Sequence, residues 1–172
     1  CITKTDSGIN GWQPSLKSFC ELNSIRMVEL KELYEIKNLI FFSLEFDQII
    51  KPDLFKSKKL FNIHFSKLPA YKGMFTSVLP ILYGETKSAV TLHLMERGID
   101  TGEIIAQDEI RITGEMRSID LYYLCLRKAI KLFSKYFPKI YNNKYKHYPQ
   151  PSIGSSYYSN KTIDYKNLQL DL

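Results

Sequence analysis

Strand-like and helix-like patterns of apolar residues alternate through the first two thirds of this 172-residue chain. Four stretches are predicted as strands: 39–42, 59–64, 89–95 and 104–112. The first of these is apolar throughout, which is typical of a strand buried on both faces of a sheet. Apolar residues at helical spacing over 118–136 predict the longest helix, with Pro138 near its end. Strands alternating with helices indicate an α/β fold with a mostly parallel sheet.

Shorter elements are predicted between these. The helices are expected at 14–22, 31–36, 49–55 and 76–83, and short strands at 2–5 and 27–30. Residues 2–5 follow Cys1 and have the pattern of a strand already under way, so we expect the first βα unit of the fold to be missing. From residue 142 the chain is polar and rich in tyrosine. We therefore expect one N-terminally incomplete domain over 1–141 and an irregular segment over 142–172 packed on it.

Composition narrows the class of protein. Hydrophobic residues make up 44% of the chain and charged residues 24%, which excludes an intrinsically disordered protein. No apolar run approaches the roughly 18 residues of a membrane-spanning helix. A net charge of +6 favours anionic partners, but the basic residues are scattered, which makes a nucleic-acid partner a poor fit. Three widely spaced cysteines predict neither disulfides nor a zinc site, and so favour a reducing cytoplasm.

Polar residues with catalytic potential lie on the predicted strand at 59–64. Asn62 and His64 are two positions apart, so both side chains point to the same face of the sheet. An amide donor beside an imidazole can bind a carbonyl that becomes an oxyanion and can move a proton near neutral pH. The same two residues could equally cap the end of the sheet by hydrogen bonding to backbone.

Two loops could complete a site beside these residues. Asp100 lies in the glycine-flanked loop 96–102, where its carboxylate could orient His64 or could simply cap a turn. The stretch 42–47 leaves the first buried strand, and its backbone polar groups could bind a flat heterocycle. A plain connecting loop explains this stretch as well.

These residues carry a resemblance to a known family. The pattern Asn-x-His-x-Ser-x-Leu-Pro-x-Tyr-Lys-Gly at 62–73, followed by Asp-Thr-Gly at 100–102, resembles the folate-dependent formyltransferases. That family includes glycinamide ribonucleotide, methionyl-tRNA and nucleotide-sugar N-formyltransferases. The resemblance covers residues 39–107 well, although Phe65 stands where the family usually has proline. It implies a Rossmann-like formyltransferase fold.

The resemblance also implies a mechanism. 10-Formyltetrahydrofolate would supply the formyl group, without a metal, and Asn62, His64 and Asp100 would be the catalytic residues. Asn62 and protonated His64 would stabilise the oxyanion. Asp100 would raise the basicity of the imidazole and help to relay the proton lost by the acceptor amine. The expected folate contacts flank this trio: Phe42, Ser43, Leu44, Gly98, Ile99 and Thr101.

Residues 61–77 and the C-terminal segment are most similar to bacterial nucleotide-sugar N-formyltransferases. This similarity implies a dTDP-linked acceptor, either 4-amino-4,6-dideoxyglucose or a 3-amino isomer, used in O-antigen and lipopolysaccharide synthesis. The alternatives are a methionyl-tRNA formyltransferase and a non-catalytic folate- or nucleotide-binding module. The expected substrate contacts are aromatic and basic: Trp12, Lys51, Tyr71, Lys72, Phe75, Tyr157 and Lys161.

Other residues invite simpler interpretations. His93 lies inside an alternating strand and is expected at the edge of the core, and His147 is expected at the surface. The aromatic stripe of the helix 118–136 is expected to be either core or the surface of a homodimer.

Overall fold

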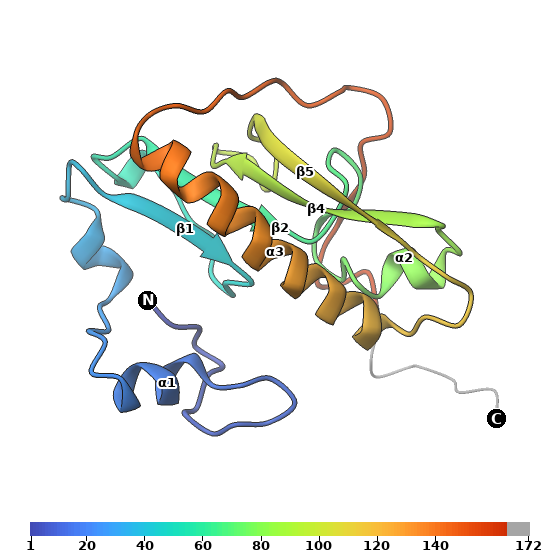
Figure 1. Ribbon diagram of the computed structural model, residues 1–172, viewed down its shortest axis with the longest axis horizontal. Helices are drawn as coiled ribbons and strands as arrows, with labels where there is room; N and C mark the ends of the chain where they lie inside the picture. Colours follow the sequence, from blue (N-terminus) through green and yellow to red (C-terminus); the bar gives the residue numbers. More distant parts are fainter. Residues whose placement is uncertain (165–172) are drawn as a thin grey trace.

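A four-stranded sheet forms the centre of the computed structural model, which describes residues 1–164 (Figure 1). Its strands lie in the order β1-β2-β4-β5. Their bounds are Ile40–Leu44 for β1, Lys59–His64 for β2, Lys87–Leu94 for β4 and Ile104–Arg111 for β5. All four strands predicted from the apolar pattern are therefore confirmed.

The direction of the strands differs from the prediction. β1 and β2 are parallel, but β2–β4 and β4–β5 are antiparallel, so the sheet is mixed rather than mostly parallel. β4 and β5 are joined directly by the loop 95–103, and such a short connection is too brief for a parallel crossover. The α/β class is right, and the error concerns only the direction of strands.

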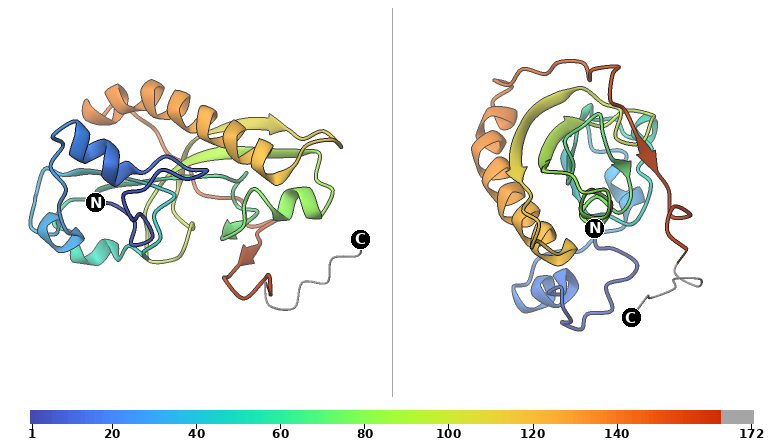
Figure 2. Two further views of the ribbon diagram at one scale, coloured as in Figure 1. Left: turned by 90° about the horizontal axis from the view of Figure 1, so that it is seen from below. Right: turned by 90° about the vertical axis from the view of Figure 1, so that its right-hand side faces the viewer.

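One long helix, α3 (Ser118–Tyr141), covers one face of this sheet (Figure 2). The helix begins where it was predicted and continues past Pro138 to Tyr141. Alternate residues of β2, Phe61 and Ile63, pack into the core beneath it. Leu60, Asn62 and His64 consequently point to the opposite face. Leu60 is buried there in a small apolar cluster with Phe41 and Phe55, and the two polar residues remain for a site.

The short elements are shorter than predicted. They comprise α1 (Leu16–Leu22), the 3₁₀ turns η1 (Leu30–Leu33) and η2 (Pro52–Leu54), and α2 (Leu79–Leu82). Ser15 caps α1 through its side chain, as the sequence indicated, and α2 starts late because Pro80 fits only the first turn of a helix. The strands expected at 2–5 and 27–30 do not form.

The tyrosine-rich C-terminal segment packs on the domain by strand pairing. β3 (Lys72–Gly73) pairs in parallel with β6 (Tyr157–Tyr158), on the side of the sheet away from α3 (Figure 2). The described part of the segment 142–172 is mostly irregular, and its residues 165–172 lie outside the described chain. Within 1–164, no helix combines the length and apolar character needed to cross a bilayer.

Candidate functional site

A row of polar side chains crosses the sheet on the face opposite α3. Ser43 of β1 is in register with Asn62 of β2, which is in register with His93 of β4. His64 lies two residues beyond Asn62, on the same face, as predicted. Three neighbouring strands thus place a hydroxyl group, an amide and two imidazoles side by side.

Asp100 reaches this row from the loop 95–103. Because β4 is antiparallel to β2, β4 ends near the start of β2. The loop must therefore fold back over the face of the sheet to bring Asp100 to Asn62 and His64. Asp100 has the left-handed φ of 54°, which is unfavourable for a residue with a side chain. Gly102 is required two residues later, because a Cβ there would lie 1.8 Å from the carbonyl oxygen of Leu94.

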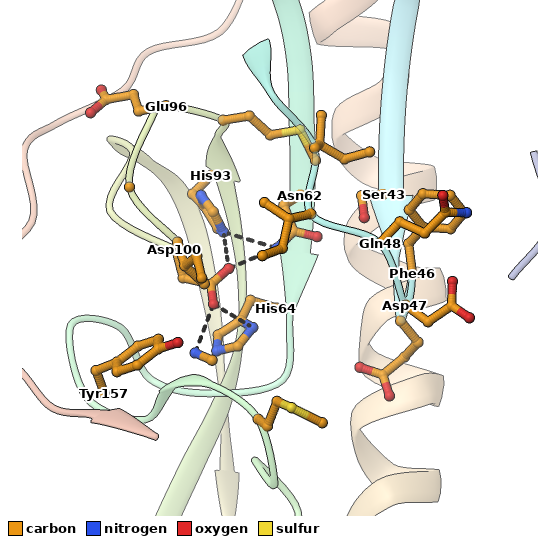
Figure 3. Close-up of a pocket in the computed structure, with 18 of the residues that line it drawn as sticks. Ser43, Phe46, Asp47, Gln48, Asn62, His64, His93, Glu96, Asp100 and Tyr157 are labelled. Atoms are coloured by element: carbon orange, nitrogen blue, oxygen red, sulfur yellow. Dashed lines mark hydrogen bonds and ion pairs between the residues drawn. The ribbon is translucent and has the colours of Figure 1, made fainter. Parts of the chain in front are cut away.

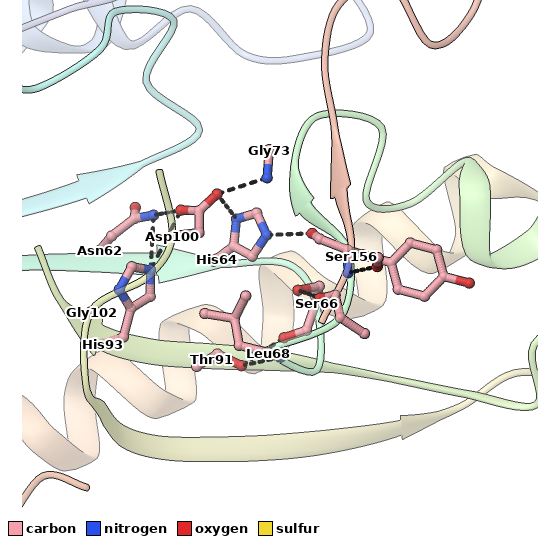
Figure 4. A network of polar contacts seen from close by, with 12 residues as sticks. Asn62, His64, Ser66, Leu68, Gly73, Thr91, His93, Asp100, Gly102 and Ser156 are labelled. Atoms are coloured by element: carbon pink, nitrogen blue, oxygen red, sulfur yellow. Dashed lines mark hydrogen bonds and ion pairs between the residues drawn. The ribbon is translucent and has the colours of Figure 1, made fainter. Parts of the chain in front are cut away.

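The carboxylate of Asp100 is the centre of the resulting network (Figure 4). Its Oδ1 accepts a hydrogen bond from Asn62 Nδ2 at 3.0 Å and lies 3.6 Å from His93 Nε2. Its Oδ2 accepts a hydrogen bond from the backbone N–H of Gly73 at 2.8 Å and lies 3.6 Å from His64 Nδ1. The trio inferred from the resemblance is therefore brought together around one carboxylate.

The ring of His64 is oriented by the backbone. Its Nε2 lies 2.8 Å from the carbonyl oxygen of Tyr71, and this nitrogen must carry a proton because a carbonyl only accepts. Burial lowers the pKa of His64, and the nearby charge of Asp100 opposes that shift without cancelling it. In the resting protein the ring is therefore mostly neutral, with Nδ1 unprotonated.

Asp100 is ionised over the physiological range. Burial acts to raise the pKa of its carboxyl group, but the N–H of Gly73 and the rings of His93 and His64, which carry positive charge at the low pH where this group titrates, outweigh burial and lower the pKa to about 2. A carboxylate beside a neutral imidazole is poised to stabilise the imidazolium that forms when the ring accepts a proton. The expected protonated His64 is thus a state reached during a reaction rather than the resting state.

His93 belongs to the same network, although its strand position suggested a residue at the edge of the core. Its Nδ1 lies 2.7 Å from the carbonyl oxygen of Leu94, so this nitrogen carries the proton. Its Nε2 consequently accepts, and it lies 3.3 Å from Asn62 Nδ2. His93 lies beside Asn62 because of the register between β2 and β4, which local sequence patterns do not predict. The one sequence signal was a histidine at a position expected to face inward.

The loop that follows β2 is held in place by buried polar contacts. Thr91 Oγ1 donates to the carbonyl oxygen of Ser66 at 2.6 Å, and Ser66 Oγ donates to that of Ala70 at 2.7 Å. Gln107 Nε2 donates to the carbonyl oxygen of Leu68 at 2.9 Å. These bonds fix the backbone on which the His64 ring depends.

A cavity of about 600 Å³ opens above the network (Figure 3). It is lined by Asn62, His64 and Asp100, and the predicted contacts Ser43, Gly98, Ile99 and Tyr157 line it too. A cavity of this size accommodates a small organic ligand. The remaining lining includes polar residues that were not among the predicted contacts: Glu45, Asp47 and Glu96 from the two candidate loops, and Gln48 beside them.

The other predicted folate contacts lie outside this cavity. Phe42 points to the opposite face of β1 and stacks on Phe61 in the core beneath α3. Leu44 is exposed, and the side chain of Thr101 packs over Gly98, where an added Cβ would lie 2.5 Å from Thr101 Oγ1.

Most of the predicted substrate contacts are also absent from the lining of this cavity. Trp12 packs edge-on against Tyr122 of α3. Tyr71 stacks on Tyr158 and donates to Glu85 through its hydroxyl group. The other four do not line the cavity either: Lys72 donates to Ser155, the carbonyl oxygen of Phe75 accepts from the N–H groups at the start of α2, and Lys51 and Lys161 are exposed.

Comparisons with known proteins agree with this geometry. A family model described as formyl transferase matches residues 32–135, and the chain belongs to this family. The chain is 48% identical to an N-formyltransferase from Helicobacter canadensis, solved with folinic acid and dTDP-3-aminofucose, with a TM-score of 0.92. It is 51% identical to WlaRD, a sugar 3N-formyl transferase solved with dTDP and 5-N-formyl-THF, with a TM-score of 0.91.

These similarities extend over most of the chain but only part of the relatives. Both solved structures match 94% of this chain, which corresponds to 60% and 59% of theirs. The bifunctional polymyxin resistance protein ArnA of Wigglesworthia glossinidia brevipalpis is 33% identical over 125 residues, which are 72% of this chain and 19% of that protein. The expected formyltransferase fold is confirmed.

Proposed function

We propose that this protein transfers a formyl group from 10-formyltetrahydrofolate to the amine of a dTDP-linked 3-amino-dideoxysugar. The observation that carries this proposal is the convergence of Asn62, His64 and Asp100 on the floor of one cavity. The two solved relatives at about half identity support the donor and acceptor classes, since both were solved with a formylated folate and a thymidine nucleotide.

The amide of Asn62 is placed to stabilise the negative charge of the reaction. When the acceptor amine attacks the formyl carbon, a new C–N bond forms and the carbonyl oxygen becomes an oxyanion. One N–H of Asn62 donates to Asp100 at 3.0 Å, while the other meets His93 at the longer distance of 3.3 Å. The longer contact is the one a formyl oxygen replaces, and such a donor contributes about 3 kcal/mol to the transition state.

His64 is placed to accept the proton of the attacking amine. Its Nδ1 is unprotonated in the resting state and faces Asp100 at 3.6 Å, while Tyr71 holds the other side of the ring. Proton uptake yields an imidazolium beside a carboxylate that is already ionised. Collapse of the tetrahedral intermediate then breaks the bond to the folate nitrogen, and the imidazolium returns the proton to that leaving nitrogen.

The two substrates approach from different walls of the cavity. Ser43, Gly98 and Ile99 line the side formed by β1 and the Asp100 loop, and we assign them to the folate. Tyr157 lines the side formed by β6, and we assign it to the nucleotide sugar together with the neighbouring Lys72 and Lys161. Lys51, Trp12 and Phe75 remain candidates for the outer part of the nucleotide. We place the reaction in cytoplasmic synthesis of surface polysaccharide.

A direct test is formyl transfer followed by mass spectrometry. The protein is incubated with 10-formyltetrahydrofolate and a panel of dTDP-, UDP- and GDP-linked amino sugars, with methionyl-tRNA in parallel. We expect the gain of one carbonyl on a dTDP-3-amino sugar. A gain confined to a 4-amino isomer would correct the position, and a gain confined to methionyl-tRNA would replace the proposal by translation initiation.

Variants separate catalysis from binding. Asn62→Ala should abolish most turnover while folate and nucleotide still bind, as measured by calorimetry. Asn142→Ala is a matched control, because Asn142 only caps the end of α3 by donating to Pro138. Folate binding without transfer to any acceptor in the wild type would make the protein a binding module, and full turnover in Asn62→Ala would refute the mechanism.

A further inference from the structure

The described part of the C-terminal segment returns to the sheet and runs beside the Asp100 loop. Tyr148 pairs with Ile104 at the start of β5 through two backbone hydrogen bonds, of 2.8 and 2.9 Å. Gln150 follows two residues later, which places its side chain against the loop 95–103. The segment then continues to β6 and pairs with β3.

The amide of Gln150 is bound to the backbone of this loop. Its Nε2 donates to the carbonyl oxygens of Asp100 and Gly102, both at 2.8 Å. Two carbonyl groups only accept, so the orientation of the amide is fixed and cannot be reversed. Gln150 therefore uses one N–H on the backbone of Asp100 and the other on the backbone of Gly102.

The other end of the Gln150 amide is unusual. Its Oε1 is buried and has no hydrogen-bond partner among residues 1–164. Buried acceptors without a protein partner are rare in native proteins. The two hydrogen bonds of Nε2 thus determine the position of the Gln150 side chain, and Oε1 does not contribute to it.

The same segment also controls the side chain of Asp100. β6 binds β3 through hydrogen bonds of 2.9 Å from Met74 to Tyr158 and from Lys72 to Ser156. This pairing fixes Gly73, whose N–H donates to Asp100 Oδ2 at 2.8 Å. The backbone of Asp100 is held by Gln150 and its carboxylate by Gly73, and both contacts depend on residues 148–158.

Such a hold is needed because Asp100 has a left-handed backbone conformation. With φ at 54°, it is in a region that few residues with a side chain occupy, although aspartate enters it more readily than most, and the contacts of its backbone help to keep it there. The hydrogen bond from Gln150 to the carbonyl oxygen of Asp100 keeps the peptide group after Asp100 from rotating to a more favourable conformation. If the peptide turned, the carboxylate would leave its place beside His64.

We propose that Gln150 is a positioning residue, which fixes the Asp100 loop so that the carboxylate faces His64 and the C-terminal segment thereby sets the geometry of proton transfer. This inference rests on the proposed function for its kinetic readout. Gln150 itself does not line the cavity, so its effect must pass through Asp100.

The experiment compares Gln150→Ala and Gln150→Glu with the wild type in the full chain. Gln150→Ala removes both donors, and we expect kcat to fall by about ten- to a hundred-fold with little change in the KM for folate. Gln150→Glu keeps the shape but turns an ionised oxygen toward two carbonyls. Protonation of the new carboxyl group restores one donor, so the kcat of this variant should recover toward low pH while that of Gln150→Ala does not.

A matched control and a second readout keep the result interpretable. Gln13→Ala removes an amide that donates only to Tyr122 in an exposed position, and it should leave kcat unchanged. NMR titration of the His64 ring, which is faced by the titratable groups of Asp100 and His93, reports on the network without turnover. In Gln150→Ala the midpoint should move to lower pH, because the carboxylate has moved away from the ring.

The two proposals fail in different ways. If the wild type formylates no amino sugar, the proposed function is wrong, and the His64 titration still tests Gln150. If both variants keep the wild-type kcat and His64 midpoint, the positioning role is refuted. It is also refuted if kcat falls only in proportion to the unfolded fraction seen by circular dichroism, with an unchanged midpoint in the folded protein.

Discussion

Replacing Asp100 by asparagine removes the charge at the centre of the site while preserving the size of the side chain. The carboxylate lies 3.6 Å from His64 Nδ1, and both groups are buried, with 9% of each side chain exposed. At an effective dielectric constant of about 20, an imidazolium and a carboxylate at this separation attract by roughly 4 to 5 kcal/mol. That attraction exists only after His64 has accepted the proton, so it lowers the barrier rather than strengthening substrate binding.

The expected loss in kcat is about 10³-fold, since each 1.36 kcal/mol corresponds to a factor of ten. The new amide also meets a donor in either orientation. With its nitrogen at the Oδ2 position it faces the N–H of Gly73, and at the Oδ1 position it faces Asn62 Nδ2. The unfavourable contact of the new amide adds to the effect of the lost charge, so the loss in kcat should be at least about 10³-fold.

The assay is formyl transfer at saturating concentrations of both substrates from pH 5.5 to 9, followed by mass spectrometry. Binding of folate is measured separately by calorimetry and should change little. A kcat within tenfold of the wild type, at a pH where the variant is folded, would show that the charge of Asp100 does not stabilise the transition state. His64 would then not form an imidazolium that depends on Asp100.

Three further predictions concern the framework of the site. Gly73→Ala places a Cβ 2.2 Å from the carbonyl oxygen of Tyr158 at a φ of 85°, so kcat should fall at least tenfold, whereas Gly84→Ala, at a φ of 67° with open space around it, should keep full activity. The pKa of Asp100 is lowered to about 2 from 3.8, so its carboxylate contributes about 2 kcal/mol to stability above pH 4, and this contribution is lost as the pH falls toward 2. Urea unfolding at pH 5 and pH 2.5 should show a loss that Asp100→Asn lacks, and an equal loss in the variant would contradict the assignment. Phe61→Ala empties a fully buried position and should lower the free energy of unfolding by about 3 to 5 kcal/mol, and a decrease below 1 kcal/mol would mean that the core collapses around it.

Local periodicity was enough to predict the strand that carries the chemistry. In β2, Phe61 and Ile63 face the core and Asn62 and His64 face the cavity, which is the alternation that any extended strand imposes. The short motif from Asn62 to Gly73 then supplied the family. Both inferences depend on residues close together in the sequence, where one strand and one loop decide the outcome.

Strand direction could not be predicted in the same way. The apolar patterns of β4 and β5 are equally compatible with either direction, and only the short loop 95–103 makes the pair antiparallel. The same limit explains Phe42, which was expected to contact folate. The apolar run 39–42 does not show which residues face α3, and the structure places Phe42 there and Ser43 on the cavity side.

The residues that hold the catalytic carboxylate are far from it in the sequence. Gly73 and Gln150 are 27 and 50 residues from Asp100. Gly73 donates through its own backbone N–H, and the side chain of Gln150 donates to the backbone carbonyl of Asp100, so neither contact is visible in the pattern around Asp100. His93 reaches the network through strand register, which depends on the whole sheet. A motif thus identifies the groups that react, whereas the geometry that makes them reactive is spread over β3, β4 and the C-terminal segment. A chain with an intact Asn-x-His motif but an altered segment around Gln150 would consequently keep its fold and its cavity and lose the alignment of Asp100 with His64.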